Sequence, residues 1–347
     1  MSKIASLNPR KTLVRSAAGA ALLAAGLGLG WLPAAASAAE IVGRLSYHWG
    51  PAHTSAIFAK EFADEVTKRS KGRLRIDTFP AGQLFGIREI QGALTAGSVE
   101  MGGVVGIISY PPVVKNFTIA SFPGLFKSFE DQRKFFTEDK VGSRVWNAVS
   151  AKTRTRVVMY NPVGPFMSFS TKSKMDSIAS MKGLKARALF KTERPRWKAL
   201  NVKMISLPTR EVYTSLQTGM IDTLNTVPNG LKAYSWWEYL KFGQLPYQAF
   251  ADAYLTANSA WFDGLPKDLQ QIILDVGKEV GAKSSAQIMK ASDDLLKEFQ
   301  GRGGVVTVLQ GAAKAEFDKL SDEVVFPALA ELVDADVLKA AQAWSKK

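Results

Sequence analysis

Few residues in this chain of 347 amino acids combine the types and the spacing that catalysis or metal binding requires. His48 and His53 are the only histidines, and their separation of five positions does not place them on one helical face, as paired zinc ligands would be. Cysteine is absent, and no serine-nucleophile, zinc-protease or phosphate-loop motif follows residue 40. We therefore expect no catalytic residue, no metal and no cofactor, with the histidines structural or ligand-lining. One alternative stays open, an exported hydrolase that uses His53 and a nearby serine.

A single arginine, Arg187, lies inside the small and mostly apolar run GLKARALF, residues 183–190, which is typical of a short strand. A guanidinium offers a planar fork of donors that matches a carboxylate in two-point contact, and it stays charged when water is removed. Arg187 is thus a candidate anion ligand. The alternative is a surface strand arginine paired with a nearby acid.

Residues 1–38 have the layout of a cleavable signal peptide, with four early cations, an apolar stretch and a small-residue end. Ala36 and Ala38 offer a cleavage site, so we expect the mature chain to begin at Ala39 or Glu40 and to be exported. The alternative is an uncleaved membrane anchor.

Loss of those four cations lowers the formal net charge from +14 to +10, so the mature protein stays basic. Its densest basic cluster, residues 68–75, has no interleaved aromatic residue that could stack on bases. We interpret this cluster as a solvated helix end and expect no nucleic-acid partner.

The order of elements after residue 40 predicts an α/β fold. Strand-like and helix-like segments alternate over residues 44–108, and a second block of the same style begins near residue 155. This order favours two α/β units with mostly parallel sheets, in which ligands bind beyond the carboxyl ends of the strands.

A helical pattern without internal proline runs from Lys267 to about Phe299. One helix of that length would span about 50 Å and should touch both units. The alternative is two helices that break near Gly281, because glycine costs about 1 kcal/mol in a helix interior. Two α/β units, export and the lack of a catalytic set together favour a clamshell receptor that closes on its ligand.

Several segments carry a family resemblance, which covers nearly the whole mature chain. In order, they are FPAGQLFGIREIQGALTAGSVEMG (79–102), FPGLF (122–126), MKGLKAR (181–187), LPTREVYTSLQTGMID (207–222) and WFDGLPKDLQQ (261–271). The chain resembles the DctP-type substrate-binding proteins of tripartite ATP-independent periplasmic (TRAP) transporters.

The resemblance implies a periplasmic two-lobed clamshell with mixed, mostly parallel sheets and a long helix spanning both lobes. Lobe I would comprise residues 39–162 and 252–289, and lobe II residues 163–251 and 290–345. The receptor, expected as a monomer, would deliver a small organic acid to a small and a large membrane permease subunit and would not be an enzyme. The motif arginine that contacts the ligand carboxylate in this family corresponds to Arg187.

Two departures from the family pattern change the expected ligand. Pro165, Phe166 and Met167 occupy the stretch where many members have a second arginine, and Asn225 and Thr226 stand where an acid and its neighbour are usual. Both changes remove charge, so we expect a monocarboxylate with an apolar or aromatic body and no metal. The predicted ligand-binding residues are Trp49, His53, Phe166, Arg187, Thr209, Asn225, Thr226 and Trp236, with Trp237 as the alternative to Trp236; the aromatic residues could equally serve core or interface packing.

Overall fold

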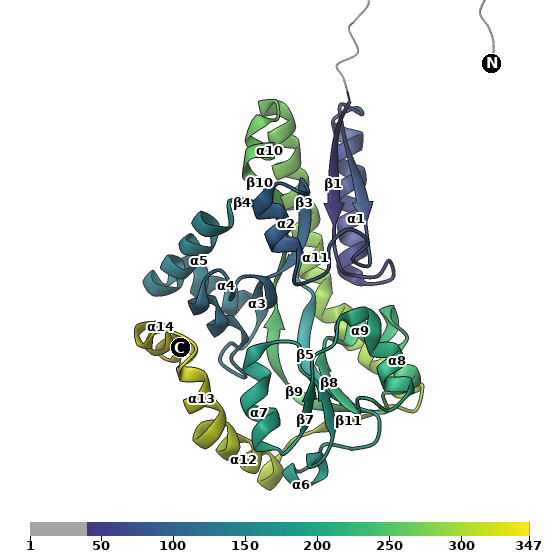
Figure 1. Ribbon diagram of the computed structural model, residues 1–347, viewed down its shortest axis with the longest axis vertical. Coiled ribbons are helices and arrows are strands. Elements are labelled where there is room, and N and C mark those ends of the chain that lie inside the picture. The colour runs from purple at the N-terminus through teal and green to yellow at the C-terminus, as the bar shows by residue number, and fades with distance from the viewer. Residues whose placement is uncertain (1–39, 347) are drawn as a thin grey trace, which may run out of the picture. The chain divides into compact units, whose positions relative to one another are not determined.

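The computed structural model describes residues 40–346 of the chain (Figure 1). The predicted signal peptide lies outside these residues. Within residues 40–346, no helix combines the length and apolar character needed to cross a membrane.

The first sheet has five strands in the order β2-β1-β3-β10-β4. β1 is parallel to β2 and β3, whereas β10 runs antiparallel to both β3 and β4. The strands are β1 (Ile41–Ser46), β2 (Leu74–Phe79), β3 (Met101–Val105), β4 (Thr155–Tyr160) and β10 (Ala253–Asn258). Helices α1 (Thr54–Arg69) and α2 (Ile90–Ala96) link the parallel strands, as the alternation of segments predicted.

The second sheet has six strands in the order β11-β9-β5-β8-β6-β7. Its strands are β5 (Gly164–Ser170), β6 (Lys185–Arg187), β7 (Lys203–Ile205), β8 (Thr223–Thr226), β9 (Phe242–Ala251) and β11 (Val305–Val308). β6 is parallel to β7 and β8, while β5 is antiparallel to β8 and β9. The predicted mixed α/β architecture with two sheets is therefore confirmed.

The chain crosses between the sheets three times, twice through short strand-to-strand connections and once through the long helix that follows β10. Residues 161–163 lead from β4 into β5, and Asp252 alone separates β9 from β10. Asp252 is fully buried and accepts hydrogen bonds from the Tyr160 hydroxyl and from Gln132 Nε2, the latter at 2.9 Å. The two strand-to-strand connections are thus short and tied to their surroundings.

Helix α11 (Lys267–Gly301) is one continuous helix of 35 residues, so the expected single helix is confirmed and the break near Gly281 is not present. It packs against α1 and β4 at the first sheet and against β5 and β11 at the second (Figure 1). Gly277 and Gly281 permit this approach. A Cβ at Gly277 would lie 1.9 Å from Val158 O, and one at Gly281 would lie 2.9 Å from Tyr160 O. The helix therefore covers the outer edge of β4, which would otherwise be an open edge strand.

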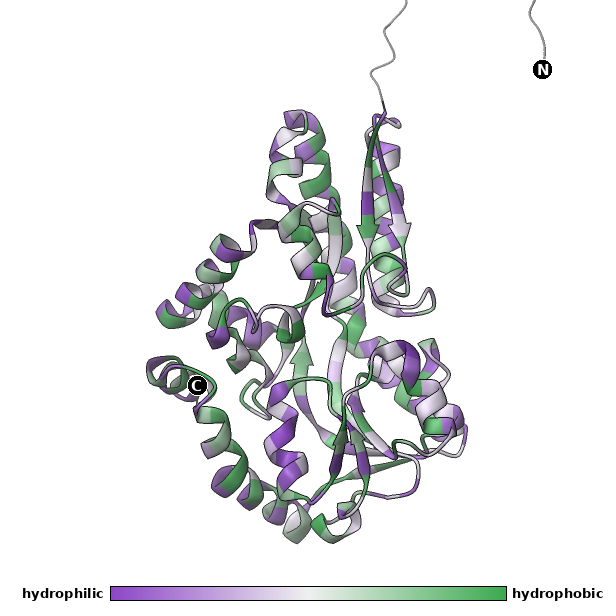
Figure 2. Ribbon diagram, viewed as in Figure 1, coloured by the Kyte–Doolittle hydropathy of each residue, from purple (hydrophilic) through white to green (hydrophobic). Residues whose placement is uncertain are grey.

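The remaining helices cover the sheets and follow the hydropathy pattern. Figure 2 shows α7 as mainly hydrophilic, in agreement with its sequence RPRWKA, in which Trp197 alone is fully buried. These helices are α3 (Gly106–Ser109), α4 (Phe129–Glu138), α5 (Lys140–Thr153), α6 (Ile178–Met181), α7 (Arg194–Ala199), α8 (Val212–Gln217), α9 (Pro228–Ala233), α10 (Ser259–Gly264), α12 (Gly311–Leu320), α13 (Phe326–Ala330) and α14 (Ala335–Ser345).

The C-terminal helix α14 packs on elements that belong to the core of the first sheet. α14 packs on α5, and its buried residues Val337 and Ala341 belong to the large apolar cluster that also contains Leu45 and Phe117. The boundaries expected for the two lobes stay a prediction.

Candidate ligand-binding cavity

Arg187, the last residue of β6, is 2% exposed and faces a small cavity. Its Nε donates to the carbonyl oxygen of Leu207 at 3.1 Å, and its Nη2 donates to Thr209 Oγ1 at 3.1 Å. Both acceptors are neutral. Burial lowers the pKa of Arg187 to about 10, against the opposing effect of Glu193, so the guanidinium is still charged at neutral pH. The arginine is therefore oriented by the protein without direct neutralisation by those two acceptors.

The cavity has a volume of about 40 Å³ and a largely apolar wall. Seven of the eight predicted ligand-binding residues line it: Trp49, His53, Phe166, Arg187, Thr209, Thr226 and Trp236. Asn225 instead lines a smaller neighbouring cavity, and its Oδ1 accepts a hydrogen bond from Ser168 Oγ at 2.7 Å. The two sheets both contribute, because Trp49 and His53 follow β1 whereas Arg187 and Thr226 end strands β6 and β8.

His53 is held in one orientation by the start of α1. Its Nδ1 accepts a hydrogen bond from the backbone N–H of Ser55 at 3.1 Å, which makes it the N-cap of that helix. Burial lowers the pKa of His53 to about 3, so the ring is neutral and carries its proton on Nε2. Ser55 Oγ donates to the carbonyl oxygen of Pro162 at 3.2 Å, not to the imidazole. The hydroxyl group of Ser55 is therefore not hydrogen-bonded to His53, which a serine activated by histidine would require.

Two pairs of rings form much of the cavity wall. Trp49 stacks on His53 with ring centres 6.2 Å apart, and Trp236 stacks on Tyr234 at 4.8 Å. Trp236 and Trp49 are both buried, and within residues 40–346 neither indole N–H has a hydrogen-bond partner. Trp237 lies elsewhere, beneath the guanidinium of Arg302 at 4.1 Å. Of the two neighbouring tryptophans, Trp236 is the one at the cavity.

Several lining residues were not predicted from the sequence. They are His48, Ile87, Val105, Ile108, Val163, Leu189, Val227, Gly230, Tyr234 and Ala251. His48 could have been found, because it precedes Trp49 at the end of a strand that reaches the site. Burial lowers its pKa to about 3, so it adds no positive charge. No sequence pattern indicates that Tyr234 lines the cavity, because its position depends on the turn after α9.

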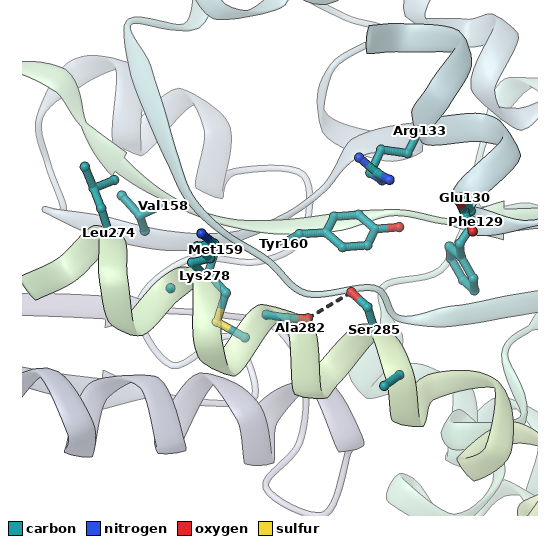
Figure 3. A pocket seen from close by; sticks show the side chains of 13 residues that line it. Phe129, Glu130, Arg133, Val158, Met159, Tyr160, Leu274, Lys278, Ala282 and Ser285 are labelled. Atoms are coloured by element: carbon teal, nitrogen blue, oxygen red, sulfur yellow. Dashed lines mark hydrogen bonds between the residues drawn. The ribbon is translucent and has the colours of Figure 1, made fainter. Parts of the chain in front are cut away.

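A second concave region lies beside the crossings, between α4, β4 and α11 (Figure 3). It is an open groove of about 670 Å³ whose polar residues include Glu130, Arg133 and Lys278. Figure 3 shows Arg133 projecting from α4 above the ring of Tyr160. Arg133 is exposed, unlike Arg187. In the described part of the chain, no group of three or more histidine, aspartate or glutamate side chains could hold a metal ion.

Residues 45–330 match the model of the DctP family, described as bacterial extracellular solute-binding protein, family 7. The chain belongs to this family. The 2,3-diketo-L-gulonate-binding periplasmic protein of Escherichia coli is 26% identical to this DctP family member over 286 residues, covering 81% of this chain and 85% of the relative. The C4-dicarboxylate-binding periplasmic protein of Rhodobacter capsulatus is 25% identical and covers 95% of this chain and 98% of its own.

Solved structures of low identity share the fold of this family member. An extracytoplasmic solute receptor of Bordetella pertussis that binds pyroglutamic acid has a TM-score of 0.78 at 21% identity, covering 88% of this chain and 99% of its own. A TRAP solute-binding protein of Shewanella oneidensis with bound succinate has a TM-score of 0.79 at 19% identity, covering 88% and 100%. The chain thus has the two-lobed fold of TRAP solute-binding proteins.

Proposed function

We propose that this TRAP solute-binding protein takes a monocarboxylate with an apolar or aromatic body, and that Arg187 binds the carboxylate. The observation that carries the proposal is a buried guanidinium, bonded to neutral acceptors, at the wall of a small and mostly apolar cavity. A carboxylate in that cavity would meet a charged donor that is already oriented and already removed from bulk solvent.

The charge of the cavity wall supports one carboxylate rather than two. Arg187 is the one permanently charged side chain among the residues that line the cavity, and both histidines there are neutral at pH 7. A second carboxylate would lose its hydration without gaining a cation, and this is costly. Trp49, Phe166 and Trp236 would instead contact an apolar body.

We further propose that residues 1–38 direct export and are removed, and that the mature receptor works in the periplasm as a monomer. Ligand contacts from both lobes would favour the closed state, because a ligand that touches both lobes binds that state more tightly. The closed receptor would then deliver the acid to a small and a large permease subunit. Lobes of residues 39–162 with 252–289, and 163–251 with 290–345, are part of this proposal. No observation favours the hydrolase alternative.

Isothermal titration calorimetry with a panel of acids tests the ligand class. We expect stoichiometric binding of an apolar monocarboxylate such as isovalerate or benzoate, much weaker binding of succinate, and no turnover of any panel member. Strong binding of succinate together with no binding of apolar monocarboxylates would overturn the proposal.

A further inference from the structure

Phe166 separates the ligand-binding cavity from a second and smaller one. It is the residue common to the two walls, with about 40 Å³ on the Arg187 side and about 10 Å³ on the other. Phe166 is 6% exposed, and Phe190 meets its ring edge-on at 5.4 Å with an interplanar angle of 89°. The aromatic pair therefore acts as a partition rather than as general core packing.

Polar side chains make up a larger share of the residues that line the smaller cavity than of those that line the cavity of Arg187, although apolar atoms cover most of both walls. Its polar lining residues are Ser121, Thr192, Glu193, Arg196, Asn225 and Gln248. A volume of about 10 Å³ is close to the least that holds one water molecule, and a polar wall is what such a water requires. The cavity therefore suits a single hydroxyl-sized group.

Glu193 supplies an unmet acceptor in this cavity. The residue is 4% exposed, and its Oε2 accepts hydrogen bonds from the backbone N–H groups of Leu189 at 2.6 Å and Phe190 at 3.1 Å. Apart from the side chain of Asn225, which interacts with the carboxyl group and lowers its pKa, Oε1 has no hydrogen-bond donor within residues 40–346. A buried carboxylate oxygen without a donor is costly, so the site favours an added O–H group.

The other polar groups of the wall are already engaged with the protein. Ser168 Oγ accepts from Gln248 Nε2 at 2.6 Å while it donates to Asn225 Oδ1. Arg196 Nη2 donates to Gln244 Oε1 at 2.7 Å, and Thr192 Oγ1 lies 3.0 Å from Ser121 Oγ. These bonds fix the wall. Asn225 is the one wall residue whose side chain also interacts with the Glu193 carboxyl group, and Glu193 Oε1 is the acceptor that an added O–H group would satisfy.

We propose that the small cavity is a hydroxyl-binding subsite beside the Arg187 cavity, and that Phe166 determines specificity by closing it to the ligand. In the native protein the subsite holds a water molecule on Glu193 Oε1. The ligand is then confined to the apolar cavity, which selects an apolar body over a hydroxylated one. With the partition removed, a polyhydroxylated monocarboxylate would keep its carboxylate on Arg187 and donate a hydroxyl to Glu193. The inference rests on the proposed function and extends it.

The test compares wild type, Phe166→Ala and Phe166→Leu by calorimetry with isovalerate and gluconate. We expect Phe166→Ala to bind gluconate at least tenfold more tightly than wild type does, and to bind isovalerate about tenfold more weakly. Phe166→Leu keeps an apolar partition and should keep the wild-type ranking of the two acids. If circular dichroism shows that Phe166→Ala does not fold, Phe166→Val, which also shortens the partition, replaces it.

A second substitution tests whether Glu193 receives the hydroxyl. In Phe166→Ala/Glu193→Gln, the amide oxygen must serve the two backbone N–H groups, so the subsite loses its acceptor. Most of the gain for gluconate should then disappear. The inference is overturned if Phe166→Ala ranks the two acids as wild type does, or if its gain for gluconate survives Glu193→Gln. In either case, binding of isovalerate by wild type that depends on Arg187 would still support the proposed function. If wild type binds neither acid through Arg187, the proposed function fails and the inference with it.

Discussion

The small cavity at Arg187 and the wide groove at Arg133 each present an arginine among aromatic and aliphatic side chains, yet the two arginines differ in their exposure to water. Arg187 is almost fully buried in a cavity of about 40 Å³, whereas Arg133 is exposed at a groove of about 670 Å³. Coulomb attraction at a given distance is several times stronger in a dry site than at a wet surface. Volume alone is therefore a poor guide to a binding site, and desolvation of a fixed charge is the better one.

The sharpest test of this comparison replaces each arginine in turn. Arg187→Ala should weaken binding of the native acid by about 2–5 kcal/mol, because an unpaired carboxylate would be left in the cavity. Arg133→Ala is the matched control and should leave affinity within about twofold of wild type. Calorimetry measures both, and equal losses in the two variants would remove the distinction between cavity and groove.

The groove's glycines should matter to folding rather than to ligand binding. Gly277→Ala would place a Cβ against Val158 O and should lower the free energy of unfolding by about 3 kcal/mol, as overpacking does. Gly301→Ala, in the same helix with nothing within 4 Å of the added atom, should change it by no more than about 0.5 kcal/mol. Urea denaturation followed by circular dichroism would separate them. Similar stability of the two variants would contradict the close approach of α11 to β4.

Each region also has a buried carboxylate near it, and both should make stability depend on pH. Burial raises the pKa of Asp252 to about 7 and that of Glu193 to about 7. Acids with a raised folded pKa contribute stability that is complete below the unfolded pKa and is lost as pH rises through the folded value. Between pH 4 and 7 each therefore lowers the free energy of unfolding by at most about 1.4 kcal/mol per pH unit. Asp252→Asn should flatten this slope in thermal unfolding measured across that range, and an unchanged slope would contradict the raised pKa.

The smallest expected effect concerns Glu193 and ligand affinity. Above pH 7 the Glu193 carboxylate is ionised, and its negative charge offsets part of the positive charge of Arg187 that a ligand carboxylate would meet. Glu193→Gln should therefore bind isovalerate a few-fold more tightly than wild type at pH 8 and about equally at pH 5.5. Glu130→Gln, at the groove, should show no such difference. Calorimetry at the two pH values decides, and weaker binding by Glu193→Gln at pH 8 would refute the electrostatic argument.

The class of fold could be predicted from the sequence alone, and Arg187 could be selected as the candidate carboxylate ligand. Apolar spacing placed α1 and the long helix, because residues three and four apart share a helical face. The sequence left two alternatives for α11, one continuous helix or a break near Gly281. The structure explains the glycine by packing, because a Cβ at Gly281 would lie too close to Tyr160 O. Arg187 could be singled out early, because a permanent charge within an apolar run conflicts with simple burial.

The boundary of the cavity could not be predicted from the sequence, because it is formed by residues that are brought together by folding. His48, Leu189 and Tyr234 come from separate parts of the chain, and no local pattern reveals that they line one wall. Asn225 and Thr226 are neighbours in β8, yet they line different cavities because successive strand residues point to opposite faces. The partition at Phe166 has a different cause, because it depends on the packing of its ring on that of Phe190, 24 positions later in the chain. No local sequence pattern indicates this contact.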